Sequence, residues 1–189
     1  MTDQPLANKT VAVLVANGFE ETDMTEPQRA LLAAGATIKL VSSEQALVNG
    51  WHGDGWGHYF TVDVVISDAL AADFDALVVP GGERSVQKLA SNPHTKRFLR
   101  GFVDGEKPLA MIGKAVTLLT VAERAAGRKL AASETEAESL QAAGAEIQEE
   151  AIFVDGPLVS AREDAASSAL KDEVLRVFSD HAIALAAAA

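Results

Sequence analysis

Short apolar, often β-branched runs alternate along the chain with stretches in which apolar residues recur at helical spacing. The runs that predict strands are Thr10–Ala16, Thr37–Ser42, Thr61–Ile66, Ala76–Val79 and Leu109–Ile112. Thr10–Ala16 is apolar almost throughout, as a central strand buried on both faces should be. This alternation predicts a parallel sheet between two helical layers.

Start and stop signals delimit the helices between these strands. Asn92 followed by Pro93 supplies a capping residue and a proline at the first helical position, and glycine follows several predicted helix ends. The predicted helices are Met24–Ala34, Pro93–Asp104, Ala115–Ala126, Ser133–Ala143 and Ser167–Leu185.

Two segments depart from the alternation. Ile152–Asp155 and Leu158–Ala161 are joined by Gly156-Pro157 and predict a β-hairpin. Ser43–Phe60 is rich in glycine, holds both tryptophans and lacks a helical period, which predicts a loop or a small hairpin. We expect one doubly wound α/β domain spanning residues 1–189.

Composition narrows the possible partners. The 16 basic and 27 acidic residues give a formal net charge of −11, which argues against nucleic acid and anionic membranes as partners. No basic flank leads into an apolar leader segment, and the longest strongly apolar run is too short to span a bilayer. The chain has no cysteine, which excludes disulfides, thiolate metal sites and thiol nucleophiles. We expect a cytoplasmic protein without a cofactor.

Ligands of open parallel sheets bind beyond the carboxyl ends of the strands. Four predicted loops lie there: Asn17–Asp23, Pro80–Arg84, Gly113–Lys114 and Arg162–Asp164. We therefore expect a site where these loops converge.

The first of these loops is acidic. Carboxylates at Glu21 and Glu26 are explained by the preference for acids at a helix N-terminus. Glu20 and Asp23, three residues apart at the strand end, are candidates to point into the crevice.

Two further loops carry candidate ligand-binding groups, which are backbone amides in one loop and a lysine in the other. Gly81, Gly82 and Glu83 could present their amides as an anion-binding nest, or form a tight turn only. Gly113-Lys114 opens a predicted helix, where the helix dipole disfavours a lysine unless an acid or a bound anion compensates. Glu20 or Asp23 is the expected partner of Lys114. A phosphate loop is rejected, because the upstream glycine spacing is wrong and Ala115 replaces its Ser or Thr.

Several of these motifs together resemble the ThiJ/PfpI superfamily of flavodoxin-like proteins. The resemblance runs from Lys9 to Val177 and rests mainly on "VAVLVANGFEETDMTEP", "GWHGDGWG" and "DFDALVVPGG". The segment from Trp51 to Trp56 resembles the branch of PfpI-like intracellular proteases or amidases and stress proteins. The superfamily also includes deglycase- and glyoxalase-type enzymes.

The resemblance places the family's Ala-Ile-Cys-His-Gly motif on residues 111–115. Gly113 then stands at the nucleophile position and Lys114 at the histidine position. The family's glutamate near the thiol falls on Asp23, with Glu20 at the companion acidic position, and Arg162 matches the family's Ser-Arg.

Three functions follow as hypotheses. The first is a family member silent in thiol chemistry that acts as a stress-related, small-ligand or anion-binding protein. The second is an enzyme of altered chemistry, a lyase, hydratase or glyoxalase-like enzyme on a small carbonyl compound, using Lys114 with Glu20 or Asp23. The third is metal binding by His52, Asp54 and His58, whose spacing matches no recognised site.

The oligomeric state and the ligand of the protein can also be stated as expectations. The resemblance implies a homodimer or a larger ring, and the aromatic segment Trp51–Phe60 would suit an interface or cap the domain's own core. The expected ligand is a small carboxylate or carbonyl compound.

Overall fold

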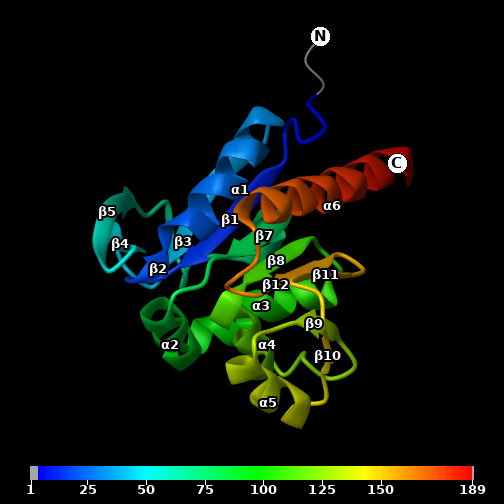
Figure 1. Cartoon of the computed structure of the whole chain (residues 1–189). Coiled ribbons are helices and arrows are strands. Elements are labelled where there is room, and N and C mark those ends of the chain that lie inside the picture. The colour runs from blue at the N-terminus through cyan, green and yellow to red at the C-terminus, as the bar shows by residue number, and fades with distance from the viewer. Residues whose placement is uncertain (1–3, 189) are drawn as a thin grey trace.

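A seven-stranded sheet in the order β11-β12-β8-β7-β1-β3-β6 forms the centre of the molecule (Figure 1). The computed structural model of the chain describes residues 4–188. The strands of the sheet are β1 Thr10–Val15, β3 Thr37–Ser42, β6 Val64–Val65, β7 Ala76–Val79, β8 Leu109–Ile112, β11 Ile152–Asp155 and β12 Leu158–Ala161. Neighbouring strands are parallel except β11 and β12, which form the predicted hairpin. The predicted mostly parallel sheet is confirmed.

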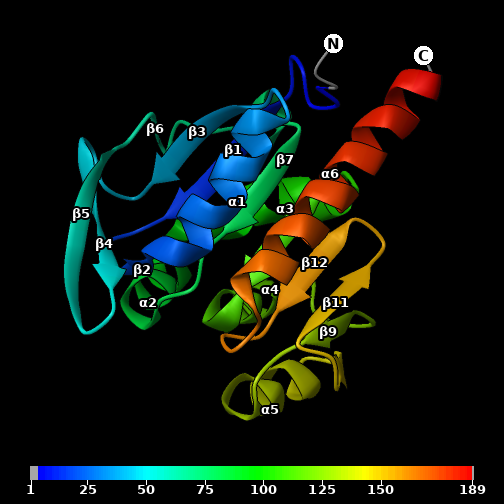
Figure 2. The ribbon, with the colours of Figure 1, turned by 45° about the horizontal axis from the view of Figure 1, so that its top comes forward.

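Helices cover both faces of this sheet. α1 Glu21–Ala33 and α6 Ser167–Ala188 lie side by side on one face (Figure 2). The helices on the other side are α2 Glu83–Ser91, α3 Pro93–Asp104, α4 Leu118–Val121 and α5 Glu134–Ala142. α5 stands beside a small parallel pair, β9 Lys129–Ala131 and β10 Glu146–Gln148. The doubly wound α/β architecture predicted from the alternation is confirmed.

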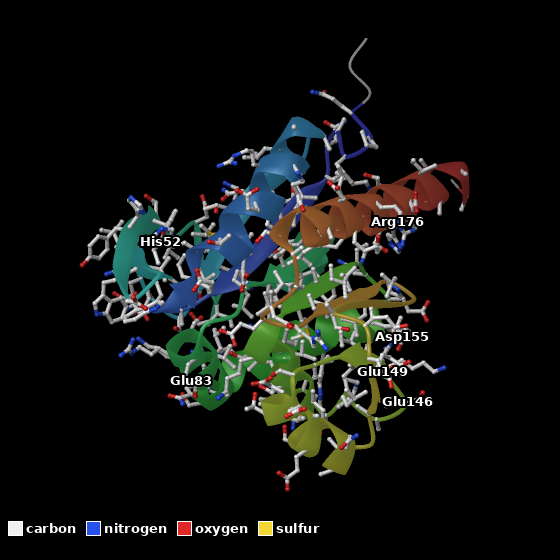
Figure 3. All side chains as sticks on the ribbon, in the orientation of Figure 1. His52, Glu83, Glu146, Glu149, Asp155 and Arg176 are labelled. Atoms are coloured by element: carbon white, nitrogen blue, oxygen red, sulfur yellow. The ribbon has the colours of Figure 1, made fainter. Side chains whose placement is uncertain are left out.

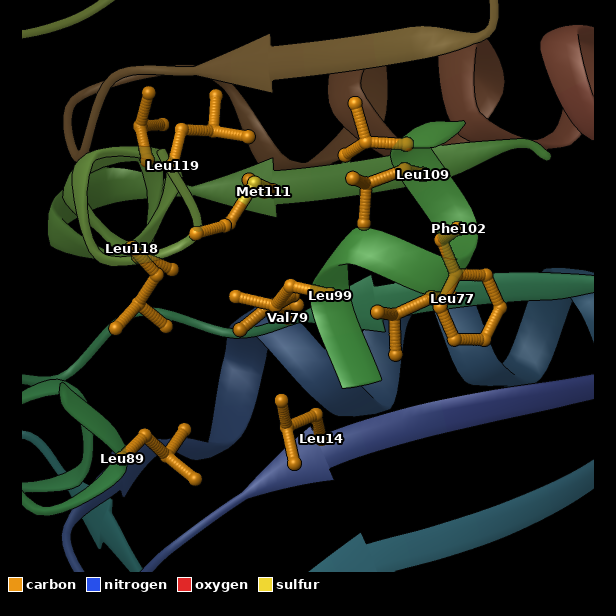
Figure 4. Packing of buried hydrophobic residues seen from close by; sticks show 14 of the residues in the cluster. Leu14, Leu77, Val79, Leu89, Leu99, Phe102, Leu109, Met111, Leu118 and Leu119 are labelled. Carbon is orange, nitrogen blue, oxygen red and sulfur yellow. The ribbon is translucent and has the colours of Figure 1, made fainter. Parts of the chain in front are cut away.

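The apolar run of β1 serves two separate cores. Val11, Val13 and Val15 pack in the cluster under α1 and α6, whereas Ala12 and Leu14 pack in the cluster under α2, α3 and α4. Successive strand residues point to opposite faces, so a strand covered on both sides must be apolar at every position. Figure 4 shows the second cluster, where Leu14 lies among Leu77, Val79 and other buried side chains.

The expected helix Ala115–Ala126 is wrong in length and type. The chain forms a 3₁₀ turn, η2 Gly113–Thr117, followed by the single turn of α4. Glu123 adopts φ +56°, which a continuing right-handed helix forbids. Arg100 Nε donates to the carbonyl of Ala122 at 2.8 Å, so a side chain replaces the missing helical partner.

The expected strand Thr61–Ile66 is too long: only Val64 and Val65 pair with β3, and Thr61 is the last residue of β5. Asp63 is the physical reason. Its carboxylate accepts the Leu40 amide at 2.8 Å, and its own amide donates to the Leu40 carbonyl. A side chain therefore takes one of the positions that a longer backbone ladder would need.

The glycine- and tryptophan-rich segment forms a hairpin, as one of its two interpretations predicts. β4 Leu47–His52 pairs antiparallel with β5 Gly55–Thr61, and the short β2 Phe19–Glu20 joins β4 in a separate three-stranded sheet. This hairpin projects beside the main sheet near the start of α1 (Figure 2). It therefore stands next to the carboxyl end of β1.

The last helix is longer than expected and reaches Ala188. Another short 3₁₀ turn, η1 Ala71–Asp73, lies before β7. Among the helices of residues 4–188, none combines the length and apolar character that crossing a bilayer requires.

Candidate functional site

A crevice of about 820 Å³ opens beyond the carboxyl ends of the central strands. The loops after β1, β7, β8 and β12 line it, together with the tip of the hairpin and part of α5. The residues singled out from the sequence that line it are Glu20, Asp23, Gly81, Gly82, Glu83, Gly113, Lys114 and Arg162. The topology thus brings four separate loops into one cavity, as the rule for open parallel sheets predicts.

Gly113 forms the corner between β8 and the following 3₁₀ turn. Its φ is +55°, a left-handed conformation that L-residues other than glycine adopt at a cost. A Cβ at Gly113 would meet its nearest neighbour, Glu163 Cβ, at 3.6 Å, which is ordinary van der Waals contact. The corner therefore has room for a side chain, and its backbone has the sharp strand-to-helix geometry that exposes nucleophiles in α/β enzymes.

Asp23 faces this corner from the first turn of α1. Its Oδ2 accepts the amide of Gly81 at 3.0 Å. Burial raises the pKa of the Asp23 carboxyl to about 7; the Gly81 hydrogen bond opposes this rise, and the negative charges of Glu20 and Glu163 add to it. An acid with a pKa near 7 can both donate and accept a proton at neutral pH.

The backbone of the turn Gly81-Gly82 lies close to the backbone of the loop after β1. A Cβ on Gly82 would lie 2.4 Å from the carbonyl oxygen of Gly18, and the residue has φ +105°. The Glu20 amide donates to the Gly81 carbonyl at 3.0 Å. Because the Gly81 amide is occupied by Asp23, the expected three-amide nest keeps at most two amides for an external anion.

Lys114 extends from the corner toward α2 rather than toward the acids of α1. Its Nζ lies 2.5 Å from Glu83 Oε2, so the expected pairing with Glu20 or Asp23 is wrong. Figure 3 shows Glu83 on α2, below the hairpin. The side chains of both partners are more than a third exposed, which makes this a weak, solvent-screened ion pair.

Arg162 is already engaged by its own loop. Its Nε and Nη2 donate to the two carboxylate oxygens of Asp164 at 3.0 and 3.2 Å. Nη1 donates to the Glu149 carbonyl at 3.3 Å. The guanidinium fork is matched by one carboxylate, which leaves it little capacity for a ligand.

Glu21 is not the simple helix-start residue that the sequence indicated. It is 5% exposed, and its carboxylate accepts both the backbone amide of His58 and, at 3.0 Å, the His58 ring nitrogen Nδ1. Burial alone would raise the pKa of the Glu21 carboxyl, but the hydrogen bonds and charge of His58 outweigh it and lower the pKa.

The Glu21 carboxylate fits between two glycines of the hairpin. A Cβ on Gly57 would lie 2.0 Å from Glu21 Oε1, and one on Gly50 would lie 2.4 Å from Glu21 Cγ. The β4–β5 register shifts between Asn49 and Trp51, which is where the carboxylate enters. Gly50 and Gly57 leave the space for this carboxylate, but glycines in a predicted hairpin do not by themselves indicate a buried acid.

The suggested metal ligands do not converge. Among residues 4–188 no group of three or more His, Cys, Asp or Glu side chains is placed to hold a metal ion. His52 ends β4, where Figure 3 shows it on the hairpin, and Asp54 lies in the turn. His58 is bound to Glu21.

Twelve further lining residues were not singled out from the sequence as site residues, and four of them carry a charge or an aromatic ring. Glu163 and Glu136 add negative charge to the crevice, and Trp51 and Arg84 form its wall on the hairpin side. The guanidinium carbon of Arg84 lies 4.5 Å from the ring centre of Trp51 and 5.5 Å from that of Trp56. No spacing rule connects these residues, because the hairpin and α2 are far apart in the sequence.

The fold and the corner site define a flavodoxin-like α/β protein with its crevice at the carboxyl ends of the strands. Residues 9–177 match the DJ-1/PfpI family, and the chain belongs to that family.

Two curated relatives and one solved structure show how far the likeness extends. Protein/nucleic acid deglycase 2 of Escherichia coli is 31% identical over 172 residues, which are 90% of this chain and 98% of the relative. General stress protein 18 of Bacillus subtilis is 31% identical over 156 residues, 82% of this chain and 88% of the relative. A ThiJ/PfpI domain protein from Brachyspira murdochii superposes with a TM-score of 0.82 at 22% identity, covering 93% of this chain and 98% of that one.

Proposed function

We propose that this protein is a cytoplasmic, stress-related member of the DJ-1/PfpI family that binds a small molecule in the crevice and performs no thiol chemistry. The observation that carries the proposal is Gly113. Its left-handed corner lies within an 820 Å³ crevice, yet it bears no side chain in a chain without cysteine. The stress-related role is supported by the name of the Bacillus subtilis relative.

Loss of a covalent nucleophile removes most of an enzyme's rate enhancement. In hydrolases that depend on such a residue, its removal lowers kcat by several orders of magnitude. The remaining parts of the crevice still bind and orient, because cavity shape and backbone donors do not depend on the missing side chain. A binding role therefore requires nothing that the chain lacks.

The test compares three proteins in methylglyoxal-turnover and peptidase assays. Wild type should show no turnover above buffer. Gly113→Cys/Lys114→His restores the family's reactive pair and should gain turnover. Gly113→Ala/Lys114→His is the matched control, with the same backbone strain and the same histidine but no thiol, and should stay inactive. Turnover by purified wild type would contradict the proposal.

A second candidate function is favoured by one specific observation, the Asp23 pKa of about 7. In this alternative Asp23 transfers protons for a lyase or hydratase acting on a small carbonyl compound, with Lys114 as amine or charge partner. Lys114 Nζ is engaged by the Glu83 carboxylate, so this contact would have to open before the amine could attack a carbonyl group. Borohydride trapping of a carbonyl adduct in wild type, absent in Lys114→Met, would favour the enzyme over the silent protein.

A further inference from the structure

Arg84 is held at the mouth of the crevice by two tryptophans. Trp51 and Trp56 pack edge to face, with ring centres 5.5 Å apart and planes at 73°, and Arg84 lies over both rings. Gly18 gives Arg84 the space it occupies, since a Cβ on Gly18 would come within 2.8 Å of Arg84 Cβ. Stacking on two rings fixes the plane of the guanidinium without using its N–H donors.

The other two basic residues of the crevice have carboxylate partners. Lys114 pairs with Glu83, and Arg162 pairs with Asp164. Arg84 makes no ion pair and donates no side-chain hydrogen bond to any residue between 4 and 188. Its five N–H donors are therefore free for a ligand.

The position of Arg84 adds to this argument. It is the second residue of α2, where the positive end of the helix dipole disfavours a cation. An anion bound to Arg84 would relieve that repulsion and would also meet the first-turn amides of the helix. The stacked guanidinium of Arg84 can therefore bind an anionic group of a ligand.

We propose that Arg84 anchors the carboxylate of a small monocarboxylate ligand, with Trp51 and Trp56 as its positioning residues. This inference rests on the proposed binding function and names the ligand class for the same crevice. Planar, bidentate pairing with carboxylate is what a fixed guanidinium does best.

The acidic residues of the crevice set the orientation of such a ligand. Five carboxyl side chains line it: Glu20, Asp23, Glu83, Glu136 and Glu163. They repel an anionic group everywhere except beside an uncompensated base, so the carboxylate binds at Arg84. The uncharged part of the ligand then extends toward Gly113 and Asp23, whose carboxyl can exchange a hydrogen bond with a hydroxyl or carbonyl group. A dianionic phosphate would meet more of this repulsion than a monocarboxylate.

Lactate and its neutral amide, lactamide, test the proposal because they differ only in charge and one polar atom. The readout is intrinsic tryptophan fluorescence at constant ionic strength, and calorimetry gives an independent affinity. Trp51 and Trp56 are the only tryptophans of the chain, so the signal comes entirely from the residues around Arg84. Wild type should respond saturably to lactate and at least tenfold more weakly to lactamide.

Three variants test how much the Arg84 guanidinium contributes to lactate binding. Arg84→Gln should weaken lactate binding at least tenfold and leave lactamide binding unchanged. Arg84→Lys keeps the charge but not the planar fork and should bind lactate with intermediate affinity. Arg29→Gln removes an exposed arginine of α1 that pairs with Glu26, and should bind like wild type. Unchanged unfolding midpoints show that the variants are folded.

Several results would overturn the proposal. They are equal affinity of wild type for lactate and lactamide, unchanged lactate binding in Arg84→Gln, no saturable response to lactate, or tighter binding of inorganic phosphate than of lactate. Binding of lactamide alone would reject the anion anchor and keep the crevice as a binding site. Failure of the proposed function is detected separately, by turnover in the thiol-substrate assays.

Discussion

The amide of Gly81 donates to the Asp23 carboxylate across 3.0 Å and so ties the loop after β7 to the first turn of α1. The same carboxyl has its pKa raised to about 7 by burial and by the neighbouring charges of Glu20 and Glu163. At neutral pH roughly half of the molecules therefore carry a proton on Asp23. Two expectations about the stability of the protein and its pH dependence follow.

Asp23→Asn should stabilise the protein at pH 8. In the folded state Asp23 binds its proton more tightly than in the unfolded chain, so ionisation above the unfolded pKa of 3.8 costs stability until pH passes about 7. Asparagine keeps an oxygen to accept the Gly81 amide without that cost. The rise from 3.8 to about 7 corresponds to about 4 kcal/mol, so urea denaturation should give a free energy of unfolding that is higher for the variant at pH 8 by up to that amount.

The advantage of Asp23→Asn should shrink as the pH falls from 7 toward 4 and vanish below the unfolded pKa. Glu26→Gln, which removes a carboxylate that pairs with Arg29 on the same helix, is the matched control. A gain of equal size at pH 4 and pH 8 would contradict the raised pKa.

Gly57→Ala should destabilise the hairpin, because its new Cβ would lie 2.0 Å from Glu21 Oε1. We expect the free energy of unfolding to fall by about 1–3 kcal/mol, as for other overpacked buried sites. Gly55→Ala, in the same strand but with nothing within 4 Å, is the control and should change stability little. The cost of Gly57→Ala should drop when Glu21→Ala is present; an unchanged cost would disprove the insertion of Glu21 between the glycines.

Gly113→Ala should lose about 1–2 kcal/mol of unfolding free energy through its left-handed backbone alone. Its Cβ meets only ordinary contacts, so Gly127→Ala, with φ +76° and open space, should cost about the same. Thermal or urea unfolding of the two variants provides the comparison. A much larger loss at Gly113 would show that the corner has no room for a side chain, and the restored-nucleophile experiment would then fail on packing.

Lys114 and Glu83 should show weak coupling in a double-mutant cycle. Both side chains are partly exposed, and pairs of this kind contribute at most about 1 kcal/mol. We expect Lys114→Gln, Glu83→Gln and the double variant to give a coupling energy below about 1 kcal/mol in urea denaturation. Stronger coupling would mean that the pair is shielded from solvent and that Lys114 has a structural role.

The sheet and the position of the crevice could be predicted from the sequence because both depend on local signals. Runs such as Thr10–Ala16 identify buried strands, and the carboxyl ends of parallel strands necessarily meet at one edge. The cap at Asn92 is equally local, and its side chain accepts the His94 amide at 2.9 Å as expected.

The remaining features depend on contacts between distant segments. The short α4 ends where Arg100 reaches the Ala122 carbonyl, and β6 is limited by the contact of the preceding Asp63 with Leu40 on β3. Lys114 pairs with an acid on α2, a helix that the sequence did not predict because it follows directly on the Gly81-Gly82 turn. The sequence indicated the loops that line the crevice but could not choose among the several acids available to each base.

The absence of any thiol has a practical consequence for measuring this crevice. A single Gly113→Cys substitution would introduce one sulfhydryl, with no background from other cysteines. Its alkylation rate across the pH range would then report the local electrostatic potential and the reagent's access at that point. Because the chain has no thiol of its own, side chains with different nucleophilic groups can be introduced at position 113 and their reactivities compared in the same protein.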